Sequence, residues 1–464
     1  MTDIRTIAQL DRSSVLHPLT QLRDYASGTL GDPTIVTGGN GIRIQDAQGR
    51  SYIDGFAGLY CVNLGYGRTE VAEAIAQQAY KMAYYHTYAA HTTEALATLS
   101  DRLVRMAPGK PSKVFYGLSG SDANETQAKL VWYYNNLRGQ PKKTKIISRQ
   151  RGYHGCSVIA GSMTGMSFFH DNMNLPVPGI LHTGVPHFYW GSEPGETEES
   201  FSRRRAAELE DMIVREGPET VGAFIGEPVL GTGGIIPPPT GYWREIQNVL
   251  RRYDVLLIAD EVICGFGRIG ADFGSIHYGM EPDLITVAKG LTSGYAPLSG
   301  AIIGEKVYSV IAEGAKGVFP HGYTYSGHPI SIAAANAVLD ILEKERINDR
   351  VKTVGAQFQR RLKERFAQLE IVGEVRGVGL LGAVEFVADR QAKRQFDPQL
   401  KVGPRISKAA RDRGLIARAM PHGDILGFAP PLVVSEAEID EIVELAYQAT
   451  KQVMNELAKE GAIK

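Results

Sequence analysis

Between residues 112 and 304, apolar residues fall into short runs that are separated by longer stretches with helical spacing. Helices are predicted in three of these stretches, at residues 123–135, 201–215 and 242–253. Strands alternating with helices are typical of a mostly parallel sheet that carries helices on both faces. The sequence therefore predicts a large α/β domain with the strands KVFYG (113–117), TKIIS (144–148), GAFIG (222–226), VLLIA (255–259), LITVA (284–288) and LSGAIIG (298–304).

The ends of the chain follow a different pattern. Residues 42–54 alternate between polar and apolar positions and turn at 47–49, which predicts a β-hairpin. After residue 329 two helices are expected, then strands around 371–387 and 415–417, and a last helix that begins with the capping spacing Ser435…Glu438. This last third reads as a small α+β domain that the hairpin joins. The predicted division is an N-terminal arm and hairpin (1–75), a large cofactor-binding domain (76–328) and a C-terminal small domain (329–464).

Two of the predicted strands end in residues that carry chemistry. The run 255–259 ends in Asp260 and Glu261, and the run 284–288 ends in Lys289. Side chains at the carboxyl ends of parallel strands line the ligand crevice of an open α/β sheet. An amine and a carboxylate at that edge suit an aldehyde cofactor, with a Schiff base at the lysine and a protonated ring nitrogen at the aspartate. A structural Asp–Lys ion pair is the equally good alternative.

A second candidate site is the turn GLSGSDANETQAKL (117–130), which follows a strand and opens a helix. Small residues there let the backbone N–H groups of Gly120 and Ser121 approach a ligand, and a helix N-terminus favours an anion such as phosphate. Asp122 and Glu125 stand at capping spacing, so a well-capped helix without a ligand explains the same residues.

The loop RGYHG (151–155) follows the next strand, which allows Tyr153 to project over the same crevice and stack on a planar ring. Val262 stands two residues after Asp260, so both are expected on one strand face, where Val262 would press on that ring. A half-buried loop tyrosine and a packed valine are the alternatives.

Composition leaves this enzyme hypothesis in place. The chain has 464 residues, a formal net charge of −1, 43 % hydrophobic and 22 % charged residues, which is ordinary for a globular enzyme and gives no field that attracts nucleic acid or anionic membranes. No apolar window approaches the ~18 residues of a spanning helix, and no signal peptide is recognised at the start. Three widely spaced cysteines (Cys61, Cys156 and Cys264) indicate neither a disulfide framework nor a zinc site. A cytoplasmic protein without a metal is expected.

Two other sequence patterns, a glycine motif and two histidine pairs, give weaker indications of a binding site. Gly377, Gly379 and Gly382 form G-x-G-x-x-G, but the strand-like AVEFV follows, whereas a dinucleotide fingerprint needs a helix there. A strand turn in the small domain is expected instead. The pairs His86/His91 and His182/His187 lack helical metal spacing and are predicted to be ordinary polar residues.

Taken in order, the motifs resemble those of the class III (omega) aminotransferases, which are pyridoxal-phosphate enzymes of fold type I. The resemblance covers nearly the whole chain and depends on the ordered set rather than on one motif. The matching segments are DGFAGLYCVNLGYGR (54–68), SGSDANE (119–125), RGYHG (151–155), GEPVLGTGG (226–234), DEVICGFGRIG (260–270), AKGLTSGYAPL (288–298) and YTYSGHP (323–329).

The resemblance implies a cofactor, pyridoxal 5′-phosphate, and a seven-stranded type of large-domain sheet. Lys289 would carry the cofactor as a Schiff base and then move the substrate proton, Asp260 would pair with the ring nitrogen, and Tyr153 and Val262 would enclose the ring. A homodimer or tetramer with shared active sites is implied, with Thr324 contributed by the second subunit. The further cofactor-binding positions that the resemblance implies are Gly120, Ser121, His154, Glu227 and Tyr323.

Within the family, Ile263 of DEVIC (260–264) resembles the pyruvate-using amine and β-alanine transaminases. Narrow, polar substrate positions favour small ω-amino acids or primary amines, and Arg418 on a mobile loop would bind the keto-acid carboxylate; the positions are Tyr60, Tyr88, Thr232 and Arg418. Two alternatives within the cofactor class remain open, a glutamate-semialdehyde-type aminomutase and a 2-oxoglutarate-dependent 4-aminobutyrate or ornithine aminotransferase. A non-enzymatic sensor of pyridoxal phosphate would need a DNA-binding segment, and none is recognised.

Overall fold

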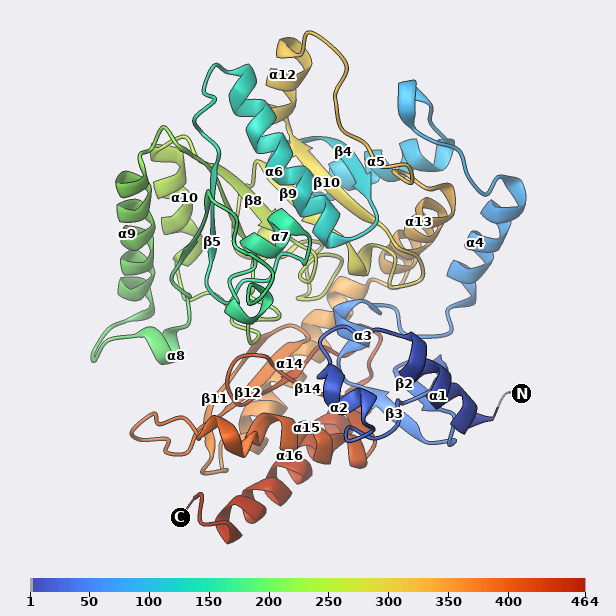
Figure 1. Cartoon of the computed structure of the whole chain (residues 1–464), viewed down its shortest axis with the longest axis vertical. Helices are drawn as coiled ribbons and strands as arrows, with labels where there is room; N and C mark the ends of the chain where they lie inside the picture. Colours follow the sequence, from blue (N-terminus) through green and yellow to red (C-terminus); the bar gives the residue numbers. More distant parts are fainter. Residues whose placement is uncertain (1–2, 464) are drawn as a thin grey trace.

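A seven-stranded sheet forms the centre of one half of the molecule, in a computed structural model that describes residues 3–463 (Figure 1). The strand order is β4-β10-β9-β8-β7-β5-β6. Within this sheet β10 runs antiparallel to both of its neighbours, and the other pairs are parallel. The predicted mostly parallel sheet is confirmed, with strands β4 (Pro111–Gly117), β5 (Lys145–Arg149), β6 (Ile180–Thr183), β7 (Val221–Gly226), β8 (Leu256–Asp260), β9 (Leu284–Val287) and β10 (Ser299–Gly304).

Helices cover both faces of this sheet. One face packs against α6 (Gly120–Leu137), α7 (Val158–Met163) and α12 (Glu305–Gly314). The other packs against α5 (Glu94–Met106), α9 (Glu198–Glu216), α10 (Tyr242–Arg252) and α13 (Pro329–Lys344). Strand β8 shows why its sequence is a continuous apolar run. Leu256 and Ile258 belong to the first core and Leu257 and Ala259 to the second, because a strand buried on both faces has no polar side.

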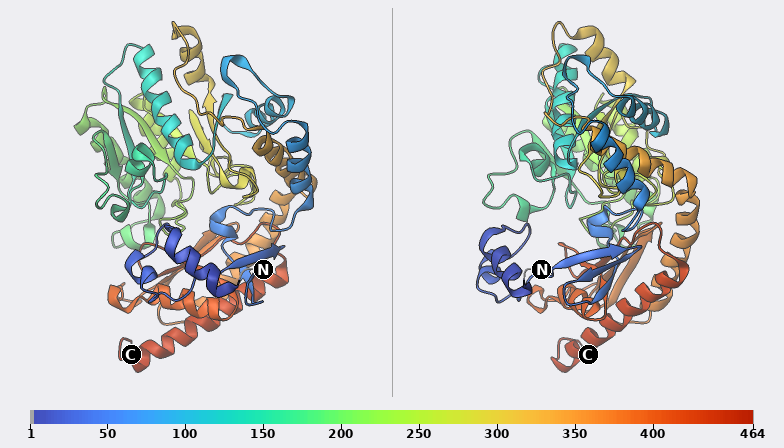
Figure 2. Two further views of the ribbon diagram at one scale, coloured as in Figure 1. Left: turned by 45° about the vertical axis from the view of Figure 1, so that its right-hand side comes forward. Right: turned by 90° about the vertical axis from the view of Figure 1, so that its right-hand side faces the viewer.

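The two ends of the chain lie together in the other half of the molecule (Figures 1 and 2). One four-stranded sheet has the order β1-β2-β3-β13 and joins both ends, because Leu415 of β13 pairs in parallel with Ile53 of β3. A second sheet has the antiparallel order β11-β12-β15-β14. The strands are β1 (Val36–Asn40), β2 (Arg43–Asp46), β3 (Ser51–Asp54), β11 (Val372–Val378), β12 (Leu381–Phe386), β13 (Leu415–Ile416), β14 (Arg418–Ala419) and β15 (Ile425–Phe428).

Three helices cover these small sheets: α14 (Ile347–Phe366), α15 (Val402–Asp412) and α16 (Glu436–Lys459). The predicted capping box is confirmed, because Ser435 and Glu438 cap the start of α16 reciprocally. Helix α13 contributes side chains to both halves, Ile332 to the core of the large sheet and Val338 to that of the small ones. The predicted division of the chain at residues 75 and 328 stays a prediction.

The remaining helices are short or N-terminal: α1 (Ile4–Ser14), α2 (Leu22–Ala26), α3 (Ala57–Tyr60), α4 (Thr69–Lys81), α8 (Phe188–Gly191), α11 (Gly274–His277) and the 3-10 turns Tyr88–Ala90, Ser167–Phe169, Lys289–Leu291 and Pro398–Leu400. Four strands were not predicted: β1 and β6, whose sequences VTGGN and ILHT show neither an apolar run nor a clear alternation, and β14 and β15, which follow the last predicted strand. Within residues 3–463 no helix has the length and apolarity that crossing a membrane requires.

Candidate active site

A cavity of about 340 Å³ opens at the carboxyl ends of β8 and β9, next to the N-terminus of α6. Its volume lies in the range of small-molecule pockets. Residues from six stretches of the chain meet there although they are far apart in sequence. The predicted site residues that line this cavity are Gly120, Ser121, Tyr153, His154, Glu227, Asp260, Val262 and Lys289.

Asp260, the last residue of β8, is 3 % exposed and surrounded by donors. Its Oδ2 accepts a hydrogen bond from Asn124 Nδ2 at 2.9 Å and lies 2.8 Å from His154 Nδ1, while Oδ1 accepts from the backbone N–H of Val262 at 3.1 Å. Burial alone would raise the pKa of Asp260, but the contacts with His154, Asn124 and Val262 outweigh it and hold the pKa below its usual range. The site therefore keeps a buried carboxylate in its ionised form.

Lys289 begins the turn after β9 and lines the same cavity. Its φ of 43° is rare for a residue other than glycine and indicates local strain of the kind that collects at functional sites. Across residues 3–463 no carboxylate lies within ion-pair distance of its amine, and the buried partner of Asp260 is His154. A structural Asp–Lys ion pair, the alternative drawn from the sequence, is therefore absent from the described residues.

The N-terminus of α6 forms the opposite end of the cavity. Ser119 is the N-cap and Asp122 its capping-box partner, which corrects the expected pairing of Asp122 with Glu125. Glu125 instead accepts from the backbone N–H groups of Ile159 and Ala160 at the start of α7. The N–H groups that open a helix have no partner inside it, so Gly120 and Ser121 offer donors toward an anion.

Two more residues line the cavity between these ends. The backbone N–H of Tyr153 donates to Glu227 Oε1 at 3.1 Å, and Glu227 Oε2 accepts from Gly231 N–H at 2.7 Å. Both carboxylate oxygens of Glu227 thus accept hydrogen bonds from backbone segments, and burial raises the pKa of this carboxyl. Val262 also lines the cavity, but it lies in the turn after β8 rather than on the strand face that the sequence predicted.

Two predicted substrate residues are buried beside the cavity. Tyr60 is 2 % exposed and has a φ of 66°, and its hydroxyl has no partner among the described residues. It packs on Phe56, with ring centroids 4.4 Å apart. Thr232 is also buried, on the segment between Glu227 and β-bridge residue Ile236. Neither side chain lines the cavity in this structure.

Three further residues lie away from the cavity of their own chain. Tyr88 is 49 % exposed, in a short turn between α4 and α5. The Tyr323 hydroxyl donates to the carbonyl of Asp122 at 3.1 Å, outside the cavity, and the carbonyl of Thr324 accepts from Tyr84 at 2.7 Å. The predicted contribution of these residues to a partner's site stays a prediction.

Arg418 does not lie on a loop, so that expectation is wrong. It is the first residue of β14, and its backbone pairs with Gly427 of β15. The guanidinium carbon lies 5.7 Å from the centroid of the Phe56 ring, and the side chain lines a separate cavity of about 620 Å³ together with Leu59 and Tyr66. Movement of the side chain, not of the backbone, would be needed to bring it toward Lys289.

This arrangement is that of a known family. A model of the aminotransferase class-III family matches residues 26–449. The chain belongs to the class III aminotransferases. An uncharacterised aminotransferase of Sinorhizobium fredii, y4uB, is 72 % identical over 461 residues, 99 % of each chain. The diaminobutyrate–2-oxoglutarate transaminase of Halomonas elongata is 56 % identical over 467 residues, 100 % of this chain and 99 % of the relative.

Solved structures agree with the predicted fold type. The omega transaminase of Pseudomonas jessenii in complex with PMP has a TM-score of 0.94 at 41 % identity, and the match covers 97 % of this chain and 99 % of that chain. The fold class, the family resemblance, the aminotransferase activity and the cofactor predicted from the sequence are confirmed. The protein is a pyridoxal-phosphate-dependent class III aminotransferase, so the hypothesis of a non-enzymatic sensor is not retained.

The cavity of this aminotransferase fits its cofactor. Free N–H donors at the start of α6 suit a phosphate, the Lys289 amine suits an aldehyde, and the ionised Asp260 suits a protonated ring nitrogen. A Cβ on Gly120 would lie 3.1 Å from Val262 Cγ2, so glycine keeps the backbone open to the ligand.

Asn124 is a residue of this site that the sequence reasoning missed. Its Nδ2 donates to Asp260 and to the carbonyl of His154, and its Oδ1 accepts from Thr286 Oγ1 at 2.8 Å. It lies inside SGSDANE, one helical turn after Gly120. Its role could have been predicted from its position, because a polar asparagine lies on the face of α6 that packs on the sheet.

Proposed function

We propose that this aminotransferase transfers an amino group from a small ω-amino acid or primary amine to pyruvate, with Lys289 as the attachment point of the cofactor. One observation carries the proposal. The Lys289 amine and the Asp260 carboxylate line one cavity; the lysine forms no ion pair with any residue from 3 to 463, and the aspartate is held ionised.

The proposal assigns a role to the residues that line the cavity. Bound pyridoxal phosphate supplies an electron sink for the substrate's Cα. Asp260 holds the proton on the ring nitrogen, and His154 and Asn124 hold Asp260. With the cofactor bound, the free Lys289 amine would act as the general base that takes the proton from the donor's Cα in the first half-reaction, and as the acid that protonates the keto-acid carbon in the second.

The remaining cofactor contacts are also proposed from the family resemblance. Gly120 and Ser121 bind the phosphate through their backbone N–H groups, with Tyr323 and Thr324 reaching the site across a dimer interface. Tyr153 and Val262 enclose the ring, and Glu227 supports Tyr153 through its backbone.

On the substrate side we propose that Tyr60, Thr232 and the partner's copy of Tyr88 narrow the pocket. The unpartnered hydroxyl of buried Tyr60 supports this, because a buried hydroxyl without a partner costs about 1–3 kcal/mol, and a bound amine or carboxylate would satisfy it. Arg418 is proposed to swing from Phe56 to the carboxylate of the keto acid, forming two parallel N–H bonds.

Pyruvate is the preferred acceptor because the chain carries the Ile263–Cys264 form of the motif, and Ile263 lines the cavity. A second acceptor, 2-oxoglutarate, is favoured by the name of the Halomonas relative, which is 56 % identical over its full length. Steady-state rates with a panel of ω-amino acids and amines, each paired with pyruvate and with 2-oxoglutarate, separate the two. Product formation without any keto acid would favour the aminomutase.

The attachment point has its own test. Borohydride reduction of the purified yellow protein should remove the visible band and leave the cofactor label on the peptide that contains Lys289. Lys289→Ala should retain cofactor non-covalently and lose turnover. Label on a different lysine contradicts the assignment, whatever the substrate proves to be.

Quaternary structure and location are proposed as well. A homodimer or a tetramer built from it is supported by exposed apolar side chains at the end of α4, in the segment that follows it and near residue 318, among them Tyr80, Tyr85 and Val318. Size-exclusion chromatography with light scattering measures this directly. A reducing cytoplasmic location is supported by the three cysteines, all of which are free thiols.

A further inference from the structure

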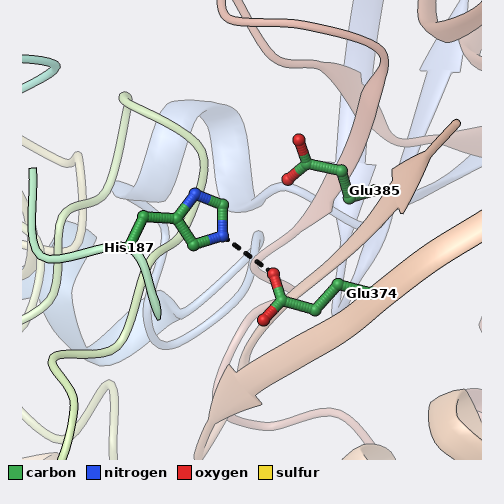
Figure 3. A group of neighbouring side chains, drawn as sticks. All are labelled: His187, Glu374 and Glu385. Atoms are coloured by element: carbon green, nitrogen blue, oxygen red, sulfur yellow. Dashed lines mark hydrogen bonds and ion pairs between the residues drawn. The ribbon is translucent and has the colours of Figure 1, made fainter. Parts of the chain in front are cut away.

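A buried ionic cluster lies between the large sheet and the β11–β12 hairpin, outside the cofactor cavity. Figure 3 shows three of its members together, with the ring of His187 directed at Glu374 and Glu385 close by. Arg376, which is 7 % exposed, donates from Nη1 to Glu374 at 2.7 Å and to Glu385 at 2.5 Å. The guanidinium therefore supplies the positive charge that the buried Glu385 and the half-buried Glu374 require, in the place where a metal ion would otherwise be suspected.

The other edge of Arg376 holds backbone carbonyls. Its Nε donates to the carbonyls of Gly234 at 3.1 Å and Ile235 at 2.9 Å, and Nη2 donates to Gly234 at 2.6 Å. From the loop after β5, Arg151 Nε donates to the carbonyl of Gly233 at 2.8 Å. Residues 231–235, here called the clamped segment, are thus held by one guanidinium from each half of the molecule.

His187 joins the two arginines into one network. Its Nδ1 lies 3.4 Å from Arg151 Nη1 and its Nε2 lies 2.8 Å from Glu374 Oε2. A guanidinium only donates, so Nδ1 accepts and Nε2 carries the hydrogen that Glu374 receives. Burial lowers the pKa of His187, although Glu374 opposes this, and the neutral ring satisfies both neighbours.

The clamped segment forms part of the support of the cofactor cavity. The N–H of Gly231 donates to Glu227, whose other oxygen accepts from the N–H of Tyr153. A Cβ on Gly231 would lie 2.3 Å from Ile263 Cδ1, so this glycine is packed directly on a side chain that lines the cavity. Displacing the segment would therefore shift the wall formed by Ile263 and Tyr153.

We propose that Arg376 is a positioning residue that determines substrate specificity in this transaminase. By tying residues 231–235 to the β11–β12 hairpin it fixes the substrate side of the cavity, and it does so without contacting cofactor or substrate. The proposal rests on the transaminase function proposed above. It assigns to the small sheet a part in selecting the amino donor.

The test uses the holoenzyme and two alternative variants. Arg376→Lys keeps the charge but cannot reach both carboxylates and both carbonyls. Arg376→Gln combined with Glu385→Gln removes one charge of each sign, so the cluster stays balanced if the lysine variant folds poorly. Arg365→Lys is the matched control, because Arg365 likewise makes two hydrogen bonds to carboxylate oxygens, both of Glu444, but at the surface of α14.

A folded Arg376 variant should keep its cofactor absorbance while kcat/KM for the preferred amine falls about tenfold or more, because a misplacement of about 1 Å caused far from the chemistry can cost about 10²-fold. The ratio of kcat/KM between a small and a bulkier amine should change, with kcat for the best donor reduced less than KM rises. Hydrogen exchange of the backbone amides of residues 231–235 should become faster in the holoenzyme of the variant, and Arg365→Lys should change none of these properties.

Two results overturn the inference. In one, a folded variant has unchanged kcat/KM, donor ratio and amide exchange. In the other, neither variant folds with bound cofactor, which would make Arg376 a residue of folding alone. If wild-type protein shows no transamination with any donor, it is the proposed function that fails, and the exchange measurement on residues 231–235 still reports on the clamp.

Discussion

Replacing Asp260 with asparagine tests the centre of the proposed site most directly. Asp260 accepts hydrogen bonds through both oxygens, from Asn124 and His154 at Oδ2 and from Val262 N–H at Oδ1. Asparagine offers one acceptor oxygen and one NH₂ group, so in either orientation the NH₂ group faces a donor. The substitution removes the charge and breaks at least one buried hydrogen bond, although it hardly changes the volume.

The expected magnitude follows from these contacts. A hydrogen bond to a charged group contributes about 1.5–3 kcal/mol, and a buried donor left without its acceptor costs about 1–3 kcal/mol more. If most of this loss falls on the reacting state, it corresponds to about 10²–10³ in kcat. The cofactor should still bind through its phosphate and Lys289.

Single-turnover kinetics with an amine donor, followed by the absorbance of the bound cofactor, measure this loss without product release. Asp283→Asn is the matched control, because Asp283 accepts the backbone N–H of Leu257 at the opposite end of β8, away from the cavity. It should retain activity within about threefold of wild type, as a partly exposed site costs little. A loss of less than tenfold in Asp260→Asn would refute the pairing of this carboxylate with the ring nitrogen.

Three other outcomes are expected. Burial raises the pKa of Glu261 to about 7, whereas in the unfolded chain it is about 4.3. The contribution of Glu261 to stability is therefore full below about pH 4.3 and is lost as the pH rises toward 7. Glu261→Gln should flatten the fall of Tm between these pH values, and an unchanged slope would refute the raised pKa. Arg418→Ala should weaken the keto-acid half-reaction about ten- to a hundredfold and leave a simple amine donor nearly unaffected, whereas equal losses in both halves would exclude the switching role. In verified heterodimers of Lys289→Ala with Thr324→Glu chains, one of two composite sites is intact, so activity should return to about half of wild type by this count of sites; no recovery would argue against shared sites.

The cofactor side of the site could be read from the sequence because it depends on strand ends. A run such as VLLIA is buried on both faces and must stop where a charged residue follows, which places Asp260 and Lys289 at one edge of the sheet. The turn before α6 was legible in part: Gly120 and Ser121 open the helix as predicted, whereas the capping box joins Ser119 and Asp122 and not Asp122 and Glu125. The local sequence pattern was sufficient to predict the position of a site residue wherever that position is set by the residue's own helix or strand.

Other parts were not predictable from local pattern. Arg418 was expected on a loop because Pro421 and Gly423 follow it, yet pairing with β15 places it on a strand. His187 was set aside because its sequence spacing suggests no ligand, while its partner Glu374, which also accepts from Arg376, lies almost two hundred positions away. Pairings of this separation are set by how the two halves pack, which no window of the sequence encodes.

The cofactor side and the substrate side of the site should respond differently to substitutions in the small sheets. Asp260 and the turn at Gly120 lie on elements of the large sheet, so substitutions in β11 or β12 leave their positions intact. The wall at Ile263 is supported by residues 231–235, which Arg376 holds from the other half of the molecule. A packed interior shifts rather than deforms smoothly, so a change in the β11–β12 hairpin is transmitted to the substrate wall while the cofactor stays bound. Donor preference should therefore vary with substitutions that never touch the donor, and cofactor affinity should vary less, since only Tyr153 among the proposed cofactor residues is linked to this segment through Glu227.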